Sequence, residues 1–120
     1  MLNEKIENGE PVTLFSNETN TAANITLSQS AANFSFLKIY YRSNDNYYGY
    51  TEIHNPNNKK FKMESYYLSR DDNNIEIKAE IAQIVDTAIR QNAEKRQIIN
   101  SGGTALEANY IYITLVLGYK

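Results

Sequence analysis

The sequence predicts an all-β protein, an antiparallel β-sandwich of jelly-roll-like form, on three observations. Short stretches in which apolar and polar residues alternate recur along most of the 120 residues, as in strands with one buried face. Clusters of Asn, Asp, Ser and Gly, which favour turns, separate these stretches. The aromatic residues are 10 tyrosines and 4 phenylalanines, types that are enriched in strands.

The chain length sets the number of domains. A chain of 120 residues and 13.7 kDa fits one domain with a modest core. We expect a single sandwich domain over residues 11–120, preceded by an N-terminal extension of residues 1–10. The sequence contains no cysteine, so neither disulfides nor thiolate metal ligands can hold the fold together.

The first half of the chain contains four candidate strands, at residues 12–15, 24–28, 36–42 and 47–54. Val12 and Leu14 would share the buried face of the first strand, and Ile25 and Leu27 that of the second. In the third strand, one set of alternate residues would face one side, Leu37, Ile39 and Tyr41, and the residues between them the other side, Lys38, Tyr40 and Arg42.

A fifth candidate strand covers residues 60–68, and the segment after it supports two interpretations. One is an amphipathic helix within residues 78–100, because five residues have helical spacing: Ile81, Ile84, Val85, Ala88 and Ile89. The other is a pair of strands, at 75–85 and 88–100, turning near Asp86-Thr87, because four residues alternate on one face: Ile75, Ile77, Ala79 and Ile81.

The last candidate strand, residues 110–117, has the clearest alternation. One face would carry four aliphatic residues, Ile111, Ile113, Leu115 and Leu117, and the other would carry Tyr110, Tyr112, Thr114 and Val116. One face is expected to join the core. The second is too aromatic to be merely solvated, so it would cover another layer, a neighbouring subunit or a ligand.

Composition and charge exclude several classes of function. A formal net charge of −2 and a pI near 5.4 argue against a nucleic-acid-binding protein. No segment approaches the length of a membrane helix, and the N-terminus lacks the apolar stretch of a signal peptide, so we expect synthesis in a cytoplasm. With one histidine, His54, and no cysteine, we expect no catalytic residues, no metal site and no cofactor.

A tyrosine-rich patch is the best candidate for a binding site. Tyrosine rings stack on the apolar faces of sugars, while Asn, Asp and tyrosine hydroxyls bond to sugar hydroxyl groups. Glycine at position 49 would let a ligand or another backbone approach closely. The same tyrosines could instead fill the core periphery or a subunit interface. The candidate glycan-binding residues are Asp45, Asn46, Tyr47, Tyr48, Tyr50, Tyr66 and Tyr67.

The chain resembles the small C-terminal β modules of tail-fibre and minor structural proteins from phages and prophages of Gram-positive bacteria. The resemblance is carried by the ending, residues 109–120, and by the order and spacing of segments upstream, at residues 14–17, 24–28, 33–39 and 54–57. In such modules the region matching residues 75–100 is two strands joined by a Gly-containing turn. Here the turn Val85-Asp86-Thr87-Ala88 lacks the glycine, and we still favour the strands because one architecture then accounts for the whole chain.

The resemblance implies a structural role in the virion, at the phage tail tip, with receptor binding and without catalysis. We therefore expect a tail-fibre or baseplate module that contacts host cell-surface polysaccharide. Its expected partners are further copies of itself, with a trimer favoured, or other tail proteins. The alternative is a carbohydrate-binding module of a bacterial enzyme or surface protein.

Overall fold

The computed structural model describes residues 10–17, 24–43, 46–68, 75–100, 103–105 and 111–120, with the side chains at 67–68, 75–76, 78, 92–100 and 103–105 excepted. The described residues form strands and one short 3-10 helix. In chain order they are β1 (Val12–Ser16), β2 (Asn24–Thr26), η1 (Ala31–Asn33), β3 (Phe36–Ser43), β4 (Tyr48–His54), β5 (Lys60–Leu68), β6 (Ile75–Val85), β7 (Ala88–Asn100), β8 (Gly103–Ala105) and β9 (Ile111–Tyr119).

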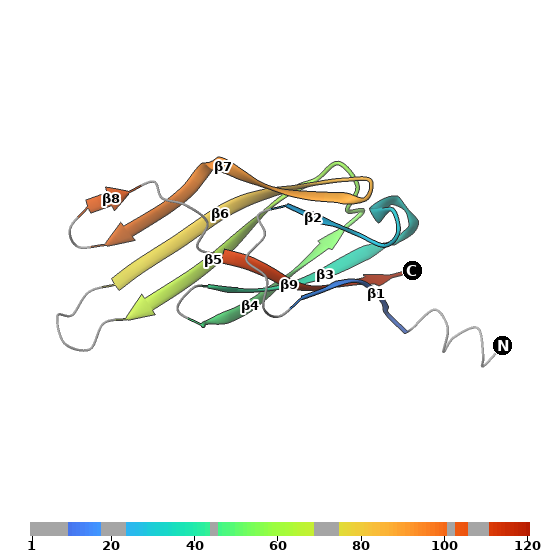
Figure 1. The fold of residues 1–120 in the computed structure, drawn as a ribbon, viewed down its shortest axis with the longest axis horizontal. Helices are drawn as coiled ribbons and strands as arrows, with labels where there is room; N and C mark the ends of the chain where they lie inside the picture. The colour runs from blue at the N-terminus through green and yellow to red at the C-terminus, as the bar shows by residue number, and fades with distance from the viewer. Residues whose placement is uncertain (1–9, 18–23, 44–45, 69–74, 101–102, 106–110) are drawn as a thin grey trace.

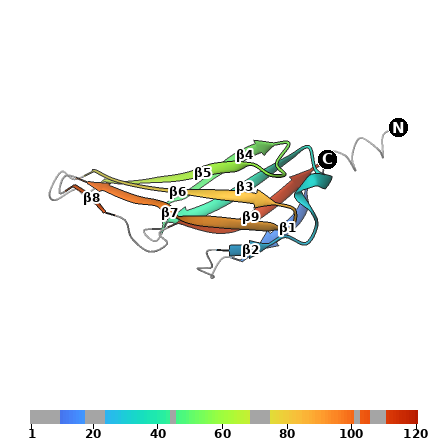
Figure 2. The same ribbon diagram turned by 90° about the horizontal axis from the view of Figure 1, so that it is seen from above.

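The strands build two antiparallel sheets that lie face to face, which confirms the all-β sandwich (Figure 1). One sheet has the order β1-β9-β3-β4 and the other has the order β2-β7-β6-β5, with β8 added to β7. Seen from above, β4 lies near β5 at one side of the sandwich and β1 lies near β2 at the other (Figure 2). Strands β5, β6 and β7 run past the end of the first sheet (Figure 1). Among the described residues, no helix is long and apolar enough to cross a membrane.

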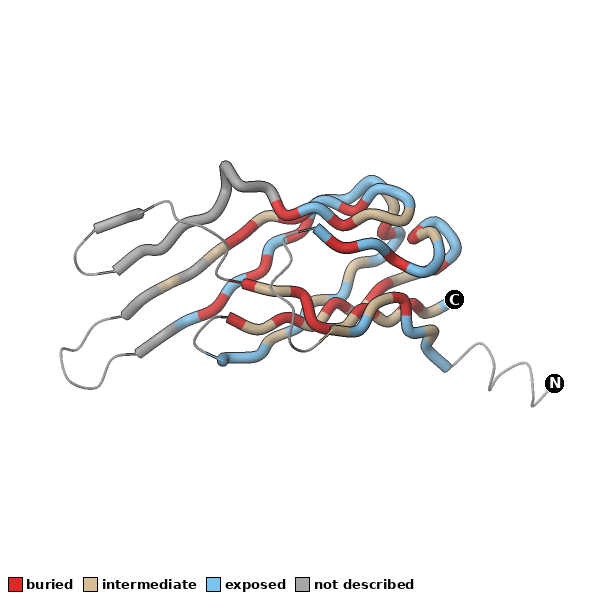
Figure 3. The backbone as a smooth tube through the Cα atoms, viewed as in Figure 1, coloured by how far each residue is buried: buried red, intermediate tan, exposed pale blue. Residues whose placement is uncertain are grey.

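The core lies between the sheets and follows the predicted alternation in most strands (Figure 3). In β3 every second residue is buried, as predicted for Leu37, Ile39 and Tyr41. Leu14, Ile25 and Leu27 are also buried, as predicted. The remaining apolar core residues are Ala31, Phe34, Phe61, Met63, Ala82, Ile84, Ile89, Ile111, Ile113 and Val116.

The segment from residue 75 to residue 100 is a strand pair, so the helix alternative within residues 78–100 is wrong. β6 and β7 pair with each other, and each has a second neighbour, β5 and β2, so that tertiary pairing overrides the local helical spacing. The turn is Asp86-Thr87, and Asp86 has a φ of 57°. Aspartate tolerates this left-handed conformation, which explains how the turn forms without a glycine.

Three of the four alternating residues of β6 have described side chains and do share a face, but that face is the outer one. Ile77, Ala79 and Ile81 are half-buried there, whereas the intervening residues Glu80, Ala82 and Ile84 are buried against the other sheet. Alternation of apolar residues predicts the opposite arrangement. It places the more hydrophobic aliphatic set in the core and Glu80 on the outer face.

A β-bulge in β9 corrects the predicted faces of the last strand. Tyr40 pairs with Leu115 and Tyr41 pairs with Ile113, so Thr114 is an extra residue on β9. Ile111 and Ile113 face the core before the bulge, and Val116 and Gly118 face it afterwards. Leu115 and Leu117 therefore lie half-buried on the outer face, so the prediction that they share a face with Ile111 and Ile113 is wrong. Tyr110 lies outside the described residues.

Gly118 is required by packing. A Cβ atom at this position would lie 2.7 Å from Cδ1 of Phe34, whose ring is buried against the strand. The glycine near the chain end therefore lets a phenylalanine from the η1 segment close the core over β9.

A polar cluster joins the two sheets at the other end of the core. Gln91 Nε2 donates to Glu80 Oε2 at 2.5 Å and to the carbonyl oxygen of Ile111 at 2.6 Å, and Ile111 N donates to Glu80 Oε1 at 3.2 Å. Glu80 and Gln91 belong to one sheet and Ile111 to the other. Since buried polar groups need partners, this cluster fixes where β9 starts relative to β6 and β7.

Candidate functional site

The outer face of the β1-β9-β3-β4 sheet gathers most of the aromatic side chains that lie outside the core. Strands β3, β4 and β9 each place every second residue on this face, because side chains alternate along a strand and β3 lies between the other two. We call this surface the aromatic face. Its residues are Phe36, Lys38, Tyr40 and Arg42 of β3, Tyr48, Tyr50, Glu52 and His54 of β4, and Tyr112, Leu115, Leu117 and Tyr119 of β9.

The first cross-strand row of the aromatic face is a stack of three rings. Phe36 pairs with His54 on one side and with Tyr119 on the other. The ring centroids of Phe36 and His54 are 5.0 Å apart, and those of Phe36 and Tyr119 are 4.5 Å apart with an interplanar angle of 6°. The row therefore forms a continuous aromatic strip at the end of the sheet where β4 and β9 terminate.

Two further rows continue the aromatic face toward the start of β4. Tyr40 stacks on Tyr50 with ring centroids 5.4 Å apart, and Leu115 lies on the other side of Tyr40. In the next row, Arg42 lies between Tyr48 and Tyr112. The exposed fractions of Tyr48 and Tyr50 are 74% and 60%, so the rings on β4 are the most accessible part of the face.

Two cations of the aromatic face lie over rings. The guanidinium carbon of Arg42 is 5.2 Å from the ring centroid of Tyr112, and Nζ of Lys38 is 5.5 Å from that of Tyr119. Neither cation forms an ion pair with a carboxylate in the described part of the chain. Their N–H groups are thus held in place by rings while remaining available to acceptors in solvent or on a ligand.

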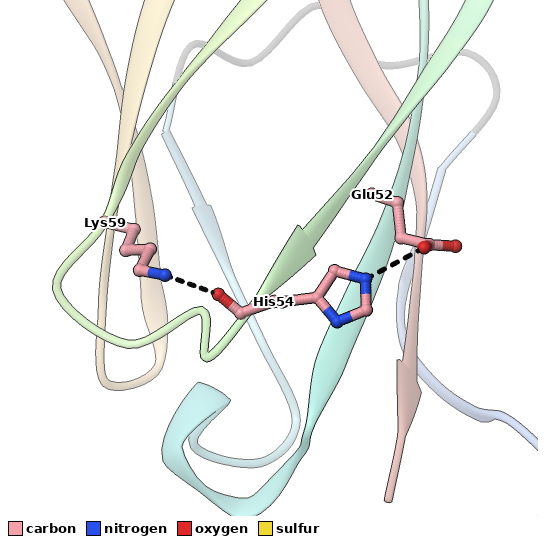
Figure 4. Close-up of polar contacts among 3 residues, drawn as sticks. All are labelled: Glu52, His54 and Lys59. Atoms are coloured by element: carbon pink, nitrogen blue, oxygen red, sulfur yellow. Dashed lines mark hydrogen bonds and ion pairs between the residues drawn. The ribbon is translucent and has the colours of Figure 1, made fainter.

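The carboxylate of the aromatic face is engaged by its neighbour on the same strand (Figure 4). Nε2 of His54 lies 3.0 Å from Oε2 of Glu52, and the exposed fractions of the two side chains are 63% and 40%. Nζ of Lys59 donates to the carbonyl oxygen of His54 at 2.8 Å. This histidine lies at the end of β4 on the surface, in contact with Phe36 and Glu52, and among the described residues no hydroxyl group is hydrogen-bonded to its ring.

The structure brings only part of the predicted tyrosine patch together. Tyr48 and Tyr50 lie on the aromatic face, whereas Tyr47, with 47% of its surface exposed, pairs with the inward-facing Ser43 and so lies on the opposite side of the sheet. Tyr66, 57% exposed, lies on the outer face of the other sheet.

The remaining predicted residues lie at the loops and ends of these strands. Asn46 is exposed in the β3–β4 connection, where its φ of 65° makes the turn. Asp45 lies outside the described residues, and Tyr67 belongs to β5 but its side chain is outside them.

Gly49 has a different role from the one predicted for it. A Cβ atom there would lie 2.9 Å from Cε1 of Tyr41, its cross-strand partner. The glycine therefore makes room for a ring of the same chain, on the buried side of the sheet. No ligand is needed to explain the glycine at this position.

The sequence-based site did not include the residues that complete the aromatic face, Phe36, Lys38, Tyr40, Arg42, Glu52, His54, Tyr112, Leu115, Leu117 and Tyr119. A partial signal existed, because Tyr40 and Arg42 were placed opposite the core in the third strand and the last strand had an aromatic second face. The strand order β9-β3-β4 brings the outer faces of these two strands together, and the bulge at Thr114 places Leu115 and Leu117 on the combined face. Neither feature can be read from local alternation.

Other concave or acidic features do not coincide with the aromatic face. A depression of about 250 Å³ is lined by Ala31, Phe34 and Asn57 among others, and one of about 320 Å³ surrounds the Asp86-Thr87 turn. Both lie at the connections between strands. Within the described residues, no group of three His, Asp or Glu side chains is placed to hold a metal ion.

No protein-family model matches this sequence, and no curated protein is significantly similar to it.

Proposed function

We propose that this chain is a non-enzymatic module of a phage tail fibre or baseplate, which contacts host cell-surface polysaccharide through the aromatic face. The single observation that supports the proposal is the set of paired rings across β4, β3 and β9, flanked by Arg42 and Lys38. The resemblance of the sequence to tail-tip modules supplies the biological setting.

The aromatic face has the chemistry that extended glycans need. Sugars present apolar C–H faces that stack on rings, and hydroxyl groups that bond to polar side chains. Tyr48 and Tyr50 supply exposed rings and hydroxyls on one strand, and Arg42 supplies N–H donors that no carboxylate of the described chain occupies. An open sheet surface suits a polymer that lies across several strands better than a small molecule that needs enclosure.

The alternative function, a carbohydrate-binding module of a bacterial enzyme or surface protein, would use the same surface. Gene neighbourhood separates the two. Tail and lysis genes beside the coding sequence support the tail module, and a hydrolase domain fused to it supports the alternative.

The binding experiment compares tyrosines on the two sheets. Affinity electrophoresis in gels that contain purified cell-wall polysaccharides would measure retardation of the wild type, a Tyr48→Ala/Tyr50→Ala variant and Tyr66→Ala. Loss of the two rings should weaken binding at least about tenfold, since each ring contact contributes on the order of 1 kcal/mol. The matched control Tyr66→Ala, an exposed tyrosine on the other sheet, should bind like the wild type. Equal retardation of all three proteins, or none with any polysaccharide, rejects the glycan proposal.

A further inference from the structure

β4 is an open edge of its sheet, and the hydrogen bonds at its two ends show which backbone groups point outward. Asn55 N donates to Ser35 O at 2.8 Å, and Ser43 N donates to Tyr47 O at 2.8 Å. In an antiparallel pair, residues alternate between pointing both backbone groups at the partner strand and pointing both away. The residues of β4 that direct N–H and C=O toward the free edge are therefore Tyr48, Tyr50, Glu52 and His54.

One of these outward groups already has a partner. Nζ of Lys59 donates to the carbonyl oxygen of His54 at 2.8 Å, as expected for a carbonyl that points to the edge. The outward backbone groups of Tyr48, Tyr50 and Glu52 face no strand of the described chain. Three successive outward positions thus form a template for another strand.

The other sheet edges in the described structure carry features that discourage strand pairing, whereas on β4 only the His54 carbonyl at the end of the strand is covered, by Lys59. β1 is bulged, and its Leu14 carbonyl accepts from Ser28 N at 2.9 Å. β2 and β8 have 3 residues each, and β5 presents Lys60 and Lys62. β4 has 7 residues that pair with β3 without a bulge, and it contains neither lysine nor proline.

We propose that a second copy of this chain pairs with β4 edge to edge, antiparallel, about a two-fold axis through Tyr50. In this register Tyr50 lies opposite Tyr50 of the second copy, so the two rings stack across the axis. Tyr48 lies opposite Glu52 of the second copy. An axis through Glu52 would set two carboxylates opposite each other. An axis through Thr51 would need the His54 carbonyl, which Lys59 holds.

The pairing joins the two four-stranded sheets into one and doubles the aromatic face in the same plane. It rests on the edge of β4 and not on glycan binding, so either proposal can fail alone. The resemblance favours a trimer, whereas an antiparallel edge pairs with its own copy only about a two-fold axis. If the face binds a repetitive polysaccharide, two linked faces would bind it with greater avidity than one.

The first test is the mass in solution, by sedimentation equilibrium from low micromolar to submillimolar concentration. Wild type should approach twice the chain mass of 13.7 kDa as concentration rises. Glu52→Pro removes an outward N–H of β4 and should remain a monomer at every concentration. Glu64→Pro is the matched control, because Glu64 is an exposed glutamate at an outward position of the other edge strand, and it should dimerise like the wild type. A monomeric wild type, or a monomeric Glu64→Pro with dimeric Glu52→Pro, overturns the proposal.

The second test does not depend on a proline variant folding. Because the sequence has no cysteine, Tyr50→Cys gives each copy one thiol at the proposed two-fold axis. Directly opposite residues have Cα atoms about 5.5 Å apart, so a short bismaleimide should convert most of Tyr50→Cys to a covalent dimer. Tyr66→Cys, at an exposed position on β5, should react without forming a dimer. Equal yields of dimer from the two variants would contradict pairing through β4.

Discussion

The outer faces of the two sheets have the same place in the fold and different side chains. On the β1-β9-β3-β4 sheet, rings pair across strands and two cations lie over rings. On the other sheet, the outer face carries the half-buried aliphatic residues Ile77, Ala79 and Ile81 beside one exposed ring among the described side chains, that of Tyr66. Its other exposed side chains are charged or amide groups, those of Lys60, Lys62, Glu64, Gln83 and Arg90. No ring pair occurs among the described residues of that second face.

The difference teaches which residues the fold requires. A sandwich needs apolar residues only on the faces that enclose the core, so the second outer face needs no paired rings. The rings of the aromatic face exceed that need, and cross-strand pairs of this kind contribute only about 0.2–1 kcal/mol each to a sheet. We therefore expect substitutions beneath the aromatic face to affect folding most, and substitutions on it to affect binding more than folding.

The largest effect on stability is expected beneath the aromatic face, at Gly118. Gly118→Ala would place a methyl group 2.7 Å from the buried ring of Phe34, and overpacking of this kind costs about 1–3 kcal/mol. Gly49→Ala should cost less, because the atom it meets is at the far end of the Tyr41 ring, which can shift. Urea unfolding followed by circular dichroism measures both. A larger loss for Gly49→Ala would contradict this account of the packing.

A smaller effect is expected at the centre of the three-ring row. Phe36→Ala removes two cross-strand ring contacts, and at about 0.2–1 kcal/mol for each pair the loss is about 0.4–2 kcal/mol. Lys62→Ala, at an exposed position on the other outer face, should change stability by less than about 0.5 kcal/mol. Thermal unfolding of the two variants sharpens the comparison, and equal losses would mean that the two outer faces do not differ in their side-chain interactions.

The smallest effect is expected for the cation over Tyr112. Arg42→Ala should lower stability by about 0.5–1 kcal/mol, the usual contribution of an exposed cation–π contact. Arg90→Ala, an exposed arginine on the other sheet, should be close to neutral. The same denaturation assay measures both variants. If Arg90→Ala is the more destabilising, the ring contact of Arg42 contributes nothing measurable.

Strands β1 to β5 and β9, and the buried side of β3, could be predicted from the sequence because each depends on local alternation. Local spacing alone did not separate β6 and β7 from a helix, and it predicts no strand at β8. The faces of β9 could not, because nothing in Tyr112-Ile113-Thr114-Leu115 marks Thr114 as a bulge. That bulge is set by its pairing with Tyr40 and Tyr41, far away in the sequence. The β6–β7 turn lies at the residues that the sequence predicts. It forms without a glycine because Asp86 adopts the required backbone conformation.

The candidate site was predicted less well than the fold for the same reason. The patch was drawn from residues that are neighbours in the sequence, such as Tyr47 and Tyr48, yet successive residues of a strand point to opposite faces. The rings that actually accompany Tyr48 and Tyr50 come from β3 and β9. Only the order of strands in the sheet assembles them, and that order is a property of the whole fold.

The most direct test of the glycan-binding surface is to map it by NMR. Backbone amide signals of the uniformly ¹⁵N-labelled protein would be followed while fragments of host cell-wall polysaccharide are added. We predict that the signals that shift belong to β3, β4 and β9, centred on Tyr40, Tyr48 and Tyr50. Shifts confined to β5, β6 and β7 would contradict the account, because the polysaccharide would then lie on the face that has no paired rings among its described residues.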